Sequence, residues 1–134
     1  MVTLKIREVR TGSVITTDGV TAQVIASFNT ATGGPNGTPL ENCSIFITAR
    51  CSGFCDTDNT AAGEWIGACF KVTDGTLQQV GGTNHAIAMI KDTGGAPNSD
   101  CGNALSSIIY FVTGVAGKTI EWFGGMEIYI CQPT

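Results

Sequence analysis

Apolar and polar residues alternate along several stretches of this chain with the period of two that is typical of β-strands. In residues 42–51 one parity is apolar throughout: Cys43, Ile45, Ile47, Ala49 and Cys51. In residues 61–73 the same holds for Ile66, Ala68, Phe70 and Val72. Such alternation places one row of side chains in a core and the other towards water or a partner. No stretch of ten or more residues repeats with period 3.6, so we expect no long helix.

The richest strand signal lies near the C-terminus. Residues 107–113 and 119–131 are dominated by β-branched and aromatic side chains and are separated by the turn Gly114–Lys118. In the second segment Ile120, Trp122, Met126, Ile128 and Ile130 share one parity. We predict that the two segments form the final hairpin of the domain, with this row of residues in the core.

The rest of the chain predicts further short strands separated by turns rich in Gly, Pro, Asn and Ser. Strands are expected at 1–10, 20–28, 76–80 and 86–90, loops at 29–41, 52–59 and 91–103, and a tight hairpin turn at Asp74-Gly75. This pattern predicts an all-β protein, a single β-sandwich or jelly-roll-like domain of about eight or nine antiparallel strands. Residues 1–10 are expected to form an N-terminal strand or arm, and residues 11–134 the sandwich domain.

The composition limits the partners of this domain. Only 13% of the 134 residues are charged, against a usual ~25%, whereas 43% are hydrophobic. The net charge is −4, and Lys5, Arg7 and Arg10 are the one local group of basic residues, so we expect no nucleic-acid binding. The longest apolar run, residues 108–112, is too short to span a bilayer, and charges near the N-terminus argue against a secretory signal. We therefore expect no membrane partner.

The six cysteines are candidates for disulfide bonds: Cys43, Cys51, Cys55, Cys69, Cys101 and Cys131. If successive strands alternate in direction, Cys51 and Cys55 meet at one end of the sandwich and form the first candidate pair. The other four then pair among themselves in any of three ways. Two alternatives stay open: Cys69 is a small buried hydrophobic residue, or cysteines at a sheet edge link neighbouring subunits.

Motifs for catalysis, metals or cofactors are weak. Cys51 and Cys55 lack the second close pair that a structural zinc site requires, and the Asp56-x-Asp58 pattern of a calcium loop is common in turns. His85, the single histidine, lies in an expected turn, where we expect it to be solvated or bonded to the backbone. We therefore expect no metal site and no catalytic residues.

The segment Gly114–Thr119 invites comparison with a phosphate-binding loop. Val112 stands where the first glycine of that motif belongs, and a strand follows instead of a helix. We therefore expect no nucleotide cofactor.

A family resemblance covers residues 14–131 and rests on the order of several short motifs. They are Thr16-Thr17-Asp18-Gly19-Val20-Thr21, Ala26-Ser27-Phe28, Thr48-Ala49-Arg50, Ala61-Ala62-Gly63-Glu64-Trp65, Phe70-Lys71-Val72, Gly75-Thr76-Leu77 and the segment Val112 to Trp122 with its Gly-Lys-Thr-Ile-Glu-Trp end. This order resembles a β-sandwich module of tailed-phage and prophage virion proteins, found at the ends of tail fibres and in stand-alone head or tail decorations. The cysteines and the Gly124-Gly125 pair depart from that pattern. Such modules share no catalytic residues, so the resemblance implies a protein that is not an enzyme.

The resemblance implies a structural virion protein of a tailed bacteriophage. The leading hypothesis is a trimeric cement or decoration protein on the capsid surface, which binds the major capsid protein and other copies of itself and stabilises the shell. One alternative is a tail-fibre or receptor-binding tip protein that recognises host glycans. Another is a small secreted lectin-like domain.

The surfaces expected to make these contacts are the N-terminal arm, the loops and one tryptophan. On the arm they are Val2, Leu4 and Ile6. Trp65 has the parity opposite to the apolar row of its strand, so it is expected to point away from the core. The loops are 29–41, 52–60 and 92–103.

Overall fold

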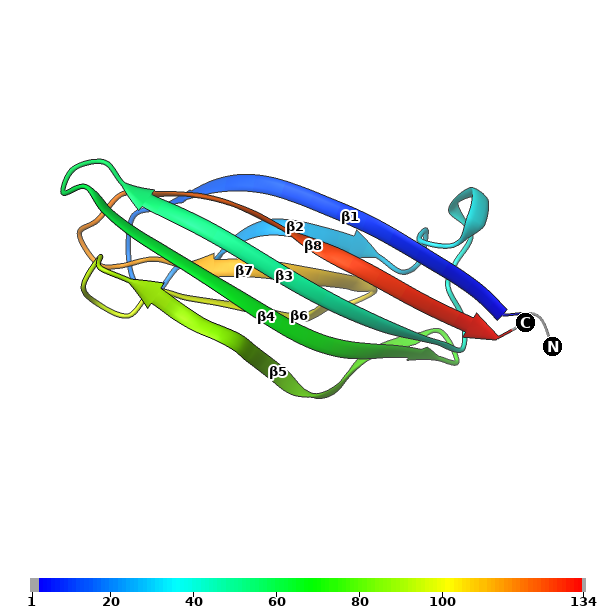
Figure 1. Cartoon of the computed structure of the whole chain (residues 1–134). Helices are drawn as coiled ribbons and strands as arrows, with labels where there is room; N and C mark the ends of the chain where they lie inside the picture. The colour runs from blue at the N-terminus through cyan, green and yellow to red at the C-terminus, as the bar shows by residue number, and fades with distance from the viewer. Residues whose placement is uncertain (1–2, 134) are drawn as a thin grey trace.

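The chain folds into a sandwich of two antiparallel sheets, which confirms the predicted fold class. The computed structural model describes residues 3–133, and Figure 1 shows the large sheet with the small sheet behind it. The large sheet has the strand order β1-β8-β3-β4-β5 and the small sheet the order β2-β7-β6. The strands are β1 (Thr3–Thr16), β2 (Gln23–Asn29), β3 (Cys43–Cys55), β4 (Thr60–Thr73), β5 (Thr76–Lys91), β6 (Asn98–Ala104), β7 (Ser107–Thr113) and β8 (Ile120–Pro133).

The two sheets differ in length. The strands of the large sheet have 13 to 16 residues, whereas each strand of the small sheet has seven. β1 pairs with β8 along its whole length, from Thr3 opposite Pro133 to Thr16 opposite Ile120. Because β3 pairs with β8 on one side and β4 on the other, it forms the middle of the large sheet.

The core lies between the inner faces of the two sheets, and the predicted alternation places its residues correctly. The apolar rows of β3, β4 and β8 are all buried, and Trp122, Ile128 and Phe70 are at most 1% exposed. The small sheet contributes Phe28, Ile108, Tyr110 and Val112. In β2 the alternation breaks at a register shift between Val24 and Ala26, which leaves Val24 exposed.

The predicted hairpin of residues 107–131 is wrong. β7 belongs to the small sheet and β8 to the large one, so residues 114–119 cross from one sheet to the other. Alternating apolar residues fit the inner face of either sheet, and therefore the pattern could not tell a hairpin from a crossover. Gly114 packs against the side chain of Thr16 at this crossing, where a Cβ atom has no room.

Several predicted boundaries also change. β3 continues to Cys55, β1 runs through Thr11–Ser13, and β5 is one strand with three register shifts in its pairing to β4. The expected loop 91–103 contains β6, whose polar residues pair through their backbone with β7. The predicted loop 29–41 holds one 3-10 turn, Pro35–Gly37. Residues 3–10 form the first part of β1, whereas Val2 lies outside the described residues.

The cysteines form no disulfide in the described structure, which corrects the predicted Cys51–Cys55 pair. Both side chains point inward from the same strand, four residues apart. Their Cα atoms are therefore separated by about 13 Å along the strand, whereas a disulfide needs less than about 7 Å. All six cysteines are free; Cys43, Cys51, Cys55 and Cys101 are buried and Cys131 is exposed.

Candidate functional site: the outer face of the large sheet

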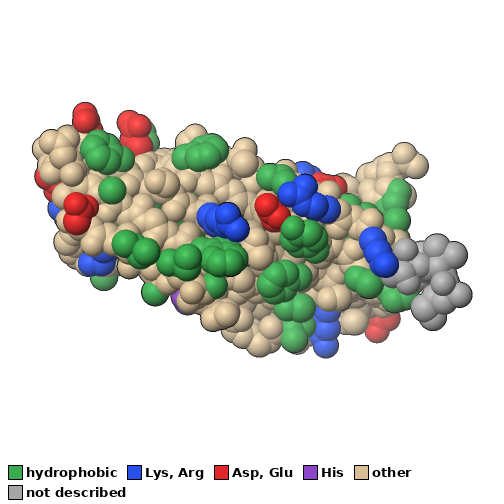
Figure 2. Space-filling view, in the orientation of Figure 1, with side chains coloured by type: hydrophobic (Ala, Val, Ile, Leu, Met, Phe, Trp, Pro, Cys, Tyr) green, Lys and Arg blue, Asp and Glu red, His purple; other side chains and the backbone are tan. Residues whose placement is uncertain are grey.

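The face of the large sheet that points away from the core is unusually apolar. We call it the outer face: the outward-pointing residues of β1, β8, β3, β4 and β5. Nine large apolar side chains on it are between 42% and 69% exposed: Val9, Ile15, Phe46, Phe54, Val80, Ile87, Ile90, Phe123 and Tyr129. In Figure 2 hydrophobic side chains lie in several groups along this face, with Lys, Arg, Asp and Glu side chains among them. Single exposed apolar residues are ordinary, but a contiguous set marks an interaction surface.

The strand register makes these residues neighbours. Residues that lie opposite each other in antiparallel strands point to the same face. One row across all five strands consists of Arg7, Tyr129, Phe46, Cys69 and Val80. A second row consists of Thr11, Gly125, Arg50, Trp65 and Ile87. The register therefore places Tyr129, Phe46 and Val80 in one row, and Trp65 and Ile87 beside Arg50 in the other.

Some charges on the outer face have partners within the chain, whereas Lys5, Lys71 and Glu121 form no ion pair in the described structure. Arg7 lies 3.5 Å from the Glu127 carboxylate, and the Tyr129 hydroxyl donates a 2.6 Å hydrogen bond to it. The bond from Tyr129, followed by the charge of Arg7, lowers the pKa of Glu127. The Arg50 guanidinium stacks over the Trp65 ring, 4.9 Å from its centroid. A partner on this face therefore meets apolar side chains together with charges, of which Arg7 and Glu127 are paired.

The structure confirms the predicted outward direction of Trp65 but places Leu4 and Ile6 on the inner face. Trp65 points outward and is half-buried; its indole N–H has no hydrogen-bond partner in the described structure. Leu4 and Ile6 point inward from β1, and Ile6 packs against the core. The parity of β1 alone could not say which of its two rows is the inner one. The large apolar residues that point outward from that strand are Val9 and Ile15, which the sequence interpretation missed.

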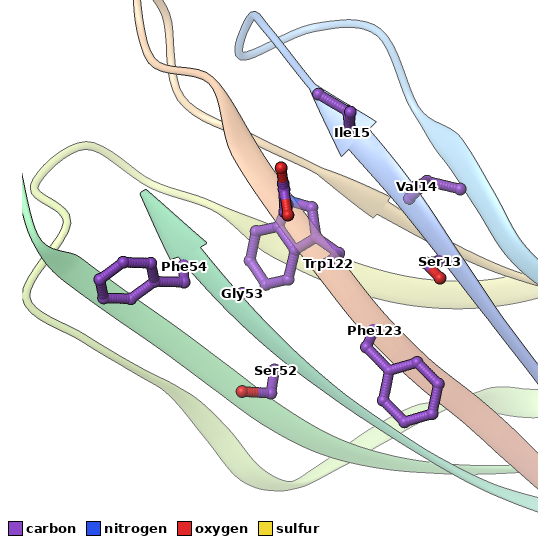
Figure 3. A pocket seen from close by; sticks show the side chains of 9 residues that line it. Ser13, Val14, Ile15, Ser52, Gly53, Phe54, Trp122 and Phe123 are labelled. Carbon is purple, nitrogen blue, oxygen red and sulfur yellow. The ribbon is translucent and has the colours of Figure 1, made fainter. Parts of the chain in front are cut away.

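A groove of about 640 Å³ lies at one end of the outer face, where β3 ends and β8 begins. Figure 3 shows Phe54 of β3 and Phe123 of β8 beside it, with Ser13 and Ile15 of β1 on the far side. The indole of Trp122 lies directly beneath Gly53, where a Cβ atom would come within 2.5 Å of the ring. The groove on the outer face therefore has aromatic walls from Phe54 and Phe123, and Glu121 also lines it.

A second cluster of polar residues lies in the interior and joins the two sheets. Glu64 of β4, whose side chain is 2% exposed, lies 2.9 Å from Nδ1 of His85 of β5. The backbone N–H and the hydroxyl of Ser99 of β6 both donate to the other oxygen of this carboxylate. The Tyr110 hydroxyl donates to Ser99, and burial raises the pKa of Tyr110. His85 is thus bonded to a carboxylate and lies in β5, which corrects the expected turn and backbone bond, while its side chain is 35% exposed and therefore solvated as expected.

This cluster has the residue types of a hydrolase but not the arrangement. In a catalytic triad the histidine lies between the hydroxyl and the carboxylate, so that it can take the hydroxyl proton. Here the carboxylate of Glu64 lies between Ser99 and His85. Ser99 is also fully buried. The arrangement therefore acts as a hydrogen-bonded connection between the sheets.

Metal-binding residues are not clustered in the part of the chain that the structure describes. Residues 3–133 contain no group of three or more His, Cys, Asp or Glu side chains placed to hold an ion. Asp58, considered for calcium, instead accepts a 2.5 Å hydrogen bond from Lys118, which lowers its pKa. Within the same residues, no helix is long and apolar enough to cross a membrane.

Comparison with known proteins yields a structural likeness only. No protein-family model matches the sequence, and no curated protein matches it. The structure is similar to the tailspike protein of Acinetobacter baumannii phage AM24, with a TM-score of 0.51 and 8% sequence identity. The likeness covers 92% of this chain and 26% of that one, so the chain spans about a quarter of the tailspike's length. At this identity the comparison shows a shared fold.

Proposed function

We propose that the chain is a structural, non-catalytic domain of a tailed-phage virion that assembles with copies of itself as a homotrimer through its outer face. The observation that carries this proposal is the set of exposed large apolar side chains on the outer face of the large sheet. A solvated sheet face is normally polar, whereas this one carries nine exposed large apolar side chains among its polar and charged residues. Burying the outer face removes that surface from water, at about 25 cal/mol per Å² before the cost of association.

The tail is the favoured location. The sequence resembles modules at the ends of tail fibres, and the similar solved structure is a phage tailspike. In a tail fibre or tailspike the domain would hold subunits together and present its remaining surface, including loops, to glycans of the host.

A capsid cement protein is the second candidate. The sequence resemblance includes stand-alone head decorations, and the same apolar face could dock on the major capsid protein. Both candidates are binding functions. The order of Ser99, Glu64 and His85 supports a non-catalytic role, because the serine hydroxyl donates to the carboxylate and not to the imidazole.

The test is the position and copy number of the chain on purified phage particles. Immunogold electron microscopy with an antibody to the chain should label the tail, and quantitative mass spectrometry should find a few copies per particle. Label on the capsid, at numbers that match its subunits, would replace the tail assignment with the cement function. Absence of the chain from purified particles would overturn both.

A further inference from the structure

We infer that the groove at the end of the outer face is a saccharide-binding site, which takes an uncharged sugar of a host glycan. The inference rests on the proposed function and deepens it, because a tail protein that meets host glycans needs a site for them on its surface. Three strands build the site: β1 contributes Ile15, β3 contributes Phe54, and β8 contributes Glu121 and Phe123.

Among the described aromatic side chains of the outer face, Phe123 is the most exposed, at 61%. Its neighbours on the face are small. The strand register places Ser13 and Ser52 opposite it on the two adjacent strands. Gly125, the next outward residue of β8, has no side chain that could cover the ring, and it belongs to the glycine pair that departs from the family resemblance. The Phe123 ring is therefore open to a ligand and has hydroxyl groups on two sides.

Glu121 lies in the next outward row of the groove, opposite Ile15 of β1 and Phe54 of β3. It forms no ion pair within residues 3–133, so its carboxylate is free to accept hydrogen bonds from a ligand. A purely apolar ligand would take water away from this charge and give it no partner, which is unfavourable. The ligand must therefore bring hydroxyl or N–H groups as well as apolar surface.

The two phenylalanines form walls that suit one ring between them. Phe54 and Phe123 occupy diagonal positions on adjacent strands, which are about 7–8 Å apart. Figure 3 shows Ser52 between the two side chains. Carbon atoms in contact lie about 3.5–4.0 Å apart, so two walls at this separation can both touch a single ring placed between them.

A sugar has the combination of groups that this lining requires. Its ring presents C–H groups, which pack on aromatic side chains, and a rim of hydroxyl groups, which bond to carboxylates and serines. The groove volume of about 640 Å³ is in the usual range of small-molecule sites. No Lys, Arg or His lines the groove in the part of the chain that the structure describes. An acidic sugar would therefore meet the Glu121 carboxylate without a compensating cation, and the lining favours an uncharged sugar.

The position of the groove is compatible with subunit contacts on the same face. Ile15, Glu121 and Phe54 form the outward row nearest the end of their strands, so the groove opens at the end of the sheet. Phe46 lies eight residues from Phe54 along β3, at a distance of about 26 Å. Copies that cover the outer face from Phe46 as far as Ser52 therefore leave this open end free for a glycan.

A matched pair of substitutions on one strand tests the site. Phe54 and Phe46 both point outward from β3 and are 47% and 46% exposed. We expect the wild-type chain to bind at least one neutral oligosaccharide on an array of neutral and acidic oligosaccharides from bacterial surfaces. In calorimetric titration with the soluble form of that oligosaccharide, Phe54→Ala should weaken the affinity about tenfold, because an aromatic contact is lost. Phe46→Ala should bind it as the wild type does.

Glu121→Ala should weaken the same affinity, because it removes the acceptor for the sugar hydroxyl groups. It replaces Phe54→Ala if circular dichroism shows that this variant is not folded. A wild-type chain that binds no neutral oligosaccharide, or only acidic ones, would overturn the site. Wild-type affinity in both Phe54→Ala and Glu121→Ala would overturn it as well.

The titration is independent of where the chain lies on the virion. A chain that is present on particles but binds no neutral oligosaccharide would overturn this inference and leave the virion assignment. A chain that binds the oligosaccharide through Phe54 but is absent from particles would overturn the virion assignment and leave the saccharide site.

Discussion

The indole N–H of Trp122 donates a 2.9 Å hydrogen bond to the hydroxyl of Thr16 in the interior of the sandwich. The two residues are 106 positions apart in sequence, and each is 1% exposed. The bond joins the start of β8 to the end of β1 and fixes the orientation of the indole. The indole lies beneath Gly53, on the core side of the sheet from the groove.

Thr16→Val should destabilise the chain by about 2 kcal/mol, because it leaves the buried indole N–H of Trp122 without an acceptor. Urea unfolding followed by tryptophan fluorescence measures the change. Thr17→Val is the matched control, since Thr17 is exposed and should tolerate the same substitution. Equal stabilities of the two variants would contradict the role assigned to this bond.

Glu64→Ala should cost about 3 kcal/mol of unfolding free energy, because it leaves the backbone N–H and the hydroxyl of Ser99 without their buried acceptor. Glu64→Gln keeps the shape and one acceptor oxygen, so its loss should be smaller. Chemical denaturation of both variants, beside the exposed control Glu41→Ala, measures the effect. If Glu64→Ala is as stable as the control, the hydrogen bonds of Glu64 between the two sheets contribute nothing to the free energy of unfolding.

The turn between β3 and β4 should make stability depend on acid pH. Hydrogen bonds from Lys118 and then Thr60 lower the pKa of Asp58 in the folded chain. Because the pKa of Asp58 is lower in the folded chain than in the unfolded chain, its carboxylate stabilises the fold at pH values above the unfolded pKa of about 4. This stabilisation is lost as the pH falls through the folded pKa. Lys118 also donates to the carbonyl of Thr93, so the ion pair connects three chain segments at this end.

Between about pH 5 and pH 2 the unfolding free energy of Asp58→Asn should therefore fall less steeply than that of the wild type. Asp56→Asn, in the same exposed turn, should keep the wild-type slope. Thermal unfolding at a series of pH values checks both variants. If stability falls with pH equally steeply in all three proteins, Asp58 does not cause the pH dependence.

The sequence pattern was sufficient for the class of fold and for most of the core. In β3 and β4 a residue's parity was enough to place it, and the Asp74-Gly75 turn forms with positive φ angles at both residues, as a two-residue hairpin requires. The partner of each strand could not be predicted. β7 and β8 carry similar apolar alternation, and nothing local distinguishes two strands of one sheet from strands of two sheets.

The candidate site was harder to predict, because it depends on register between strands distant in sequence. Phe46 and Phe123 were the apolar exceptions in their outward rows, and this was the sequence signal for the outer face. The row that joins Tyr129, Phe46 and Val80 exists because β3 lies between β8 and β4. β6 was missed for a similar reason, since its polar residues are held in a strand by pairing with β7.

The central claim is that the outer face is covered in the native assembly, and thiol labelling tests it most directly. In a chain with Cys69→Ser and Cys131→Ser, which removes the two native thiols of that face, Ser52→Cys places a thiol on the outer face of β3. Ser27→Cys places one on the outer surface of the small sheet; both serines are exposed in the single chain. The account predicts that in the native assembly the thiol at position 52 reacts several times more slowly than the thiol at position 27, and that adding Phe46→Asp removes the difference. Equal rates in the native assembly would contradict it.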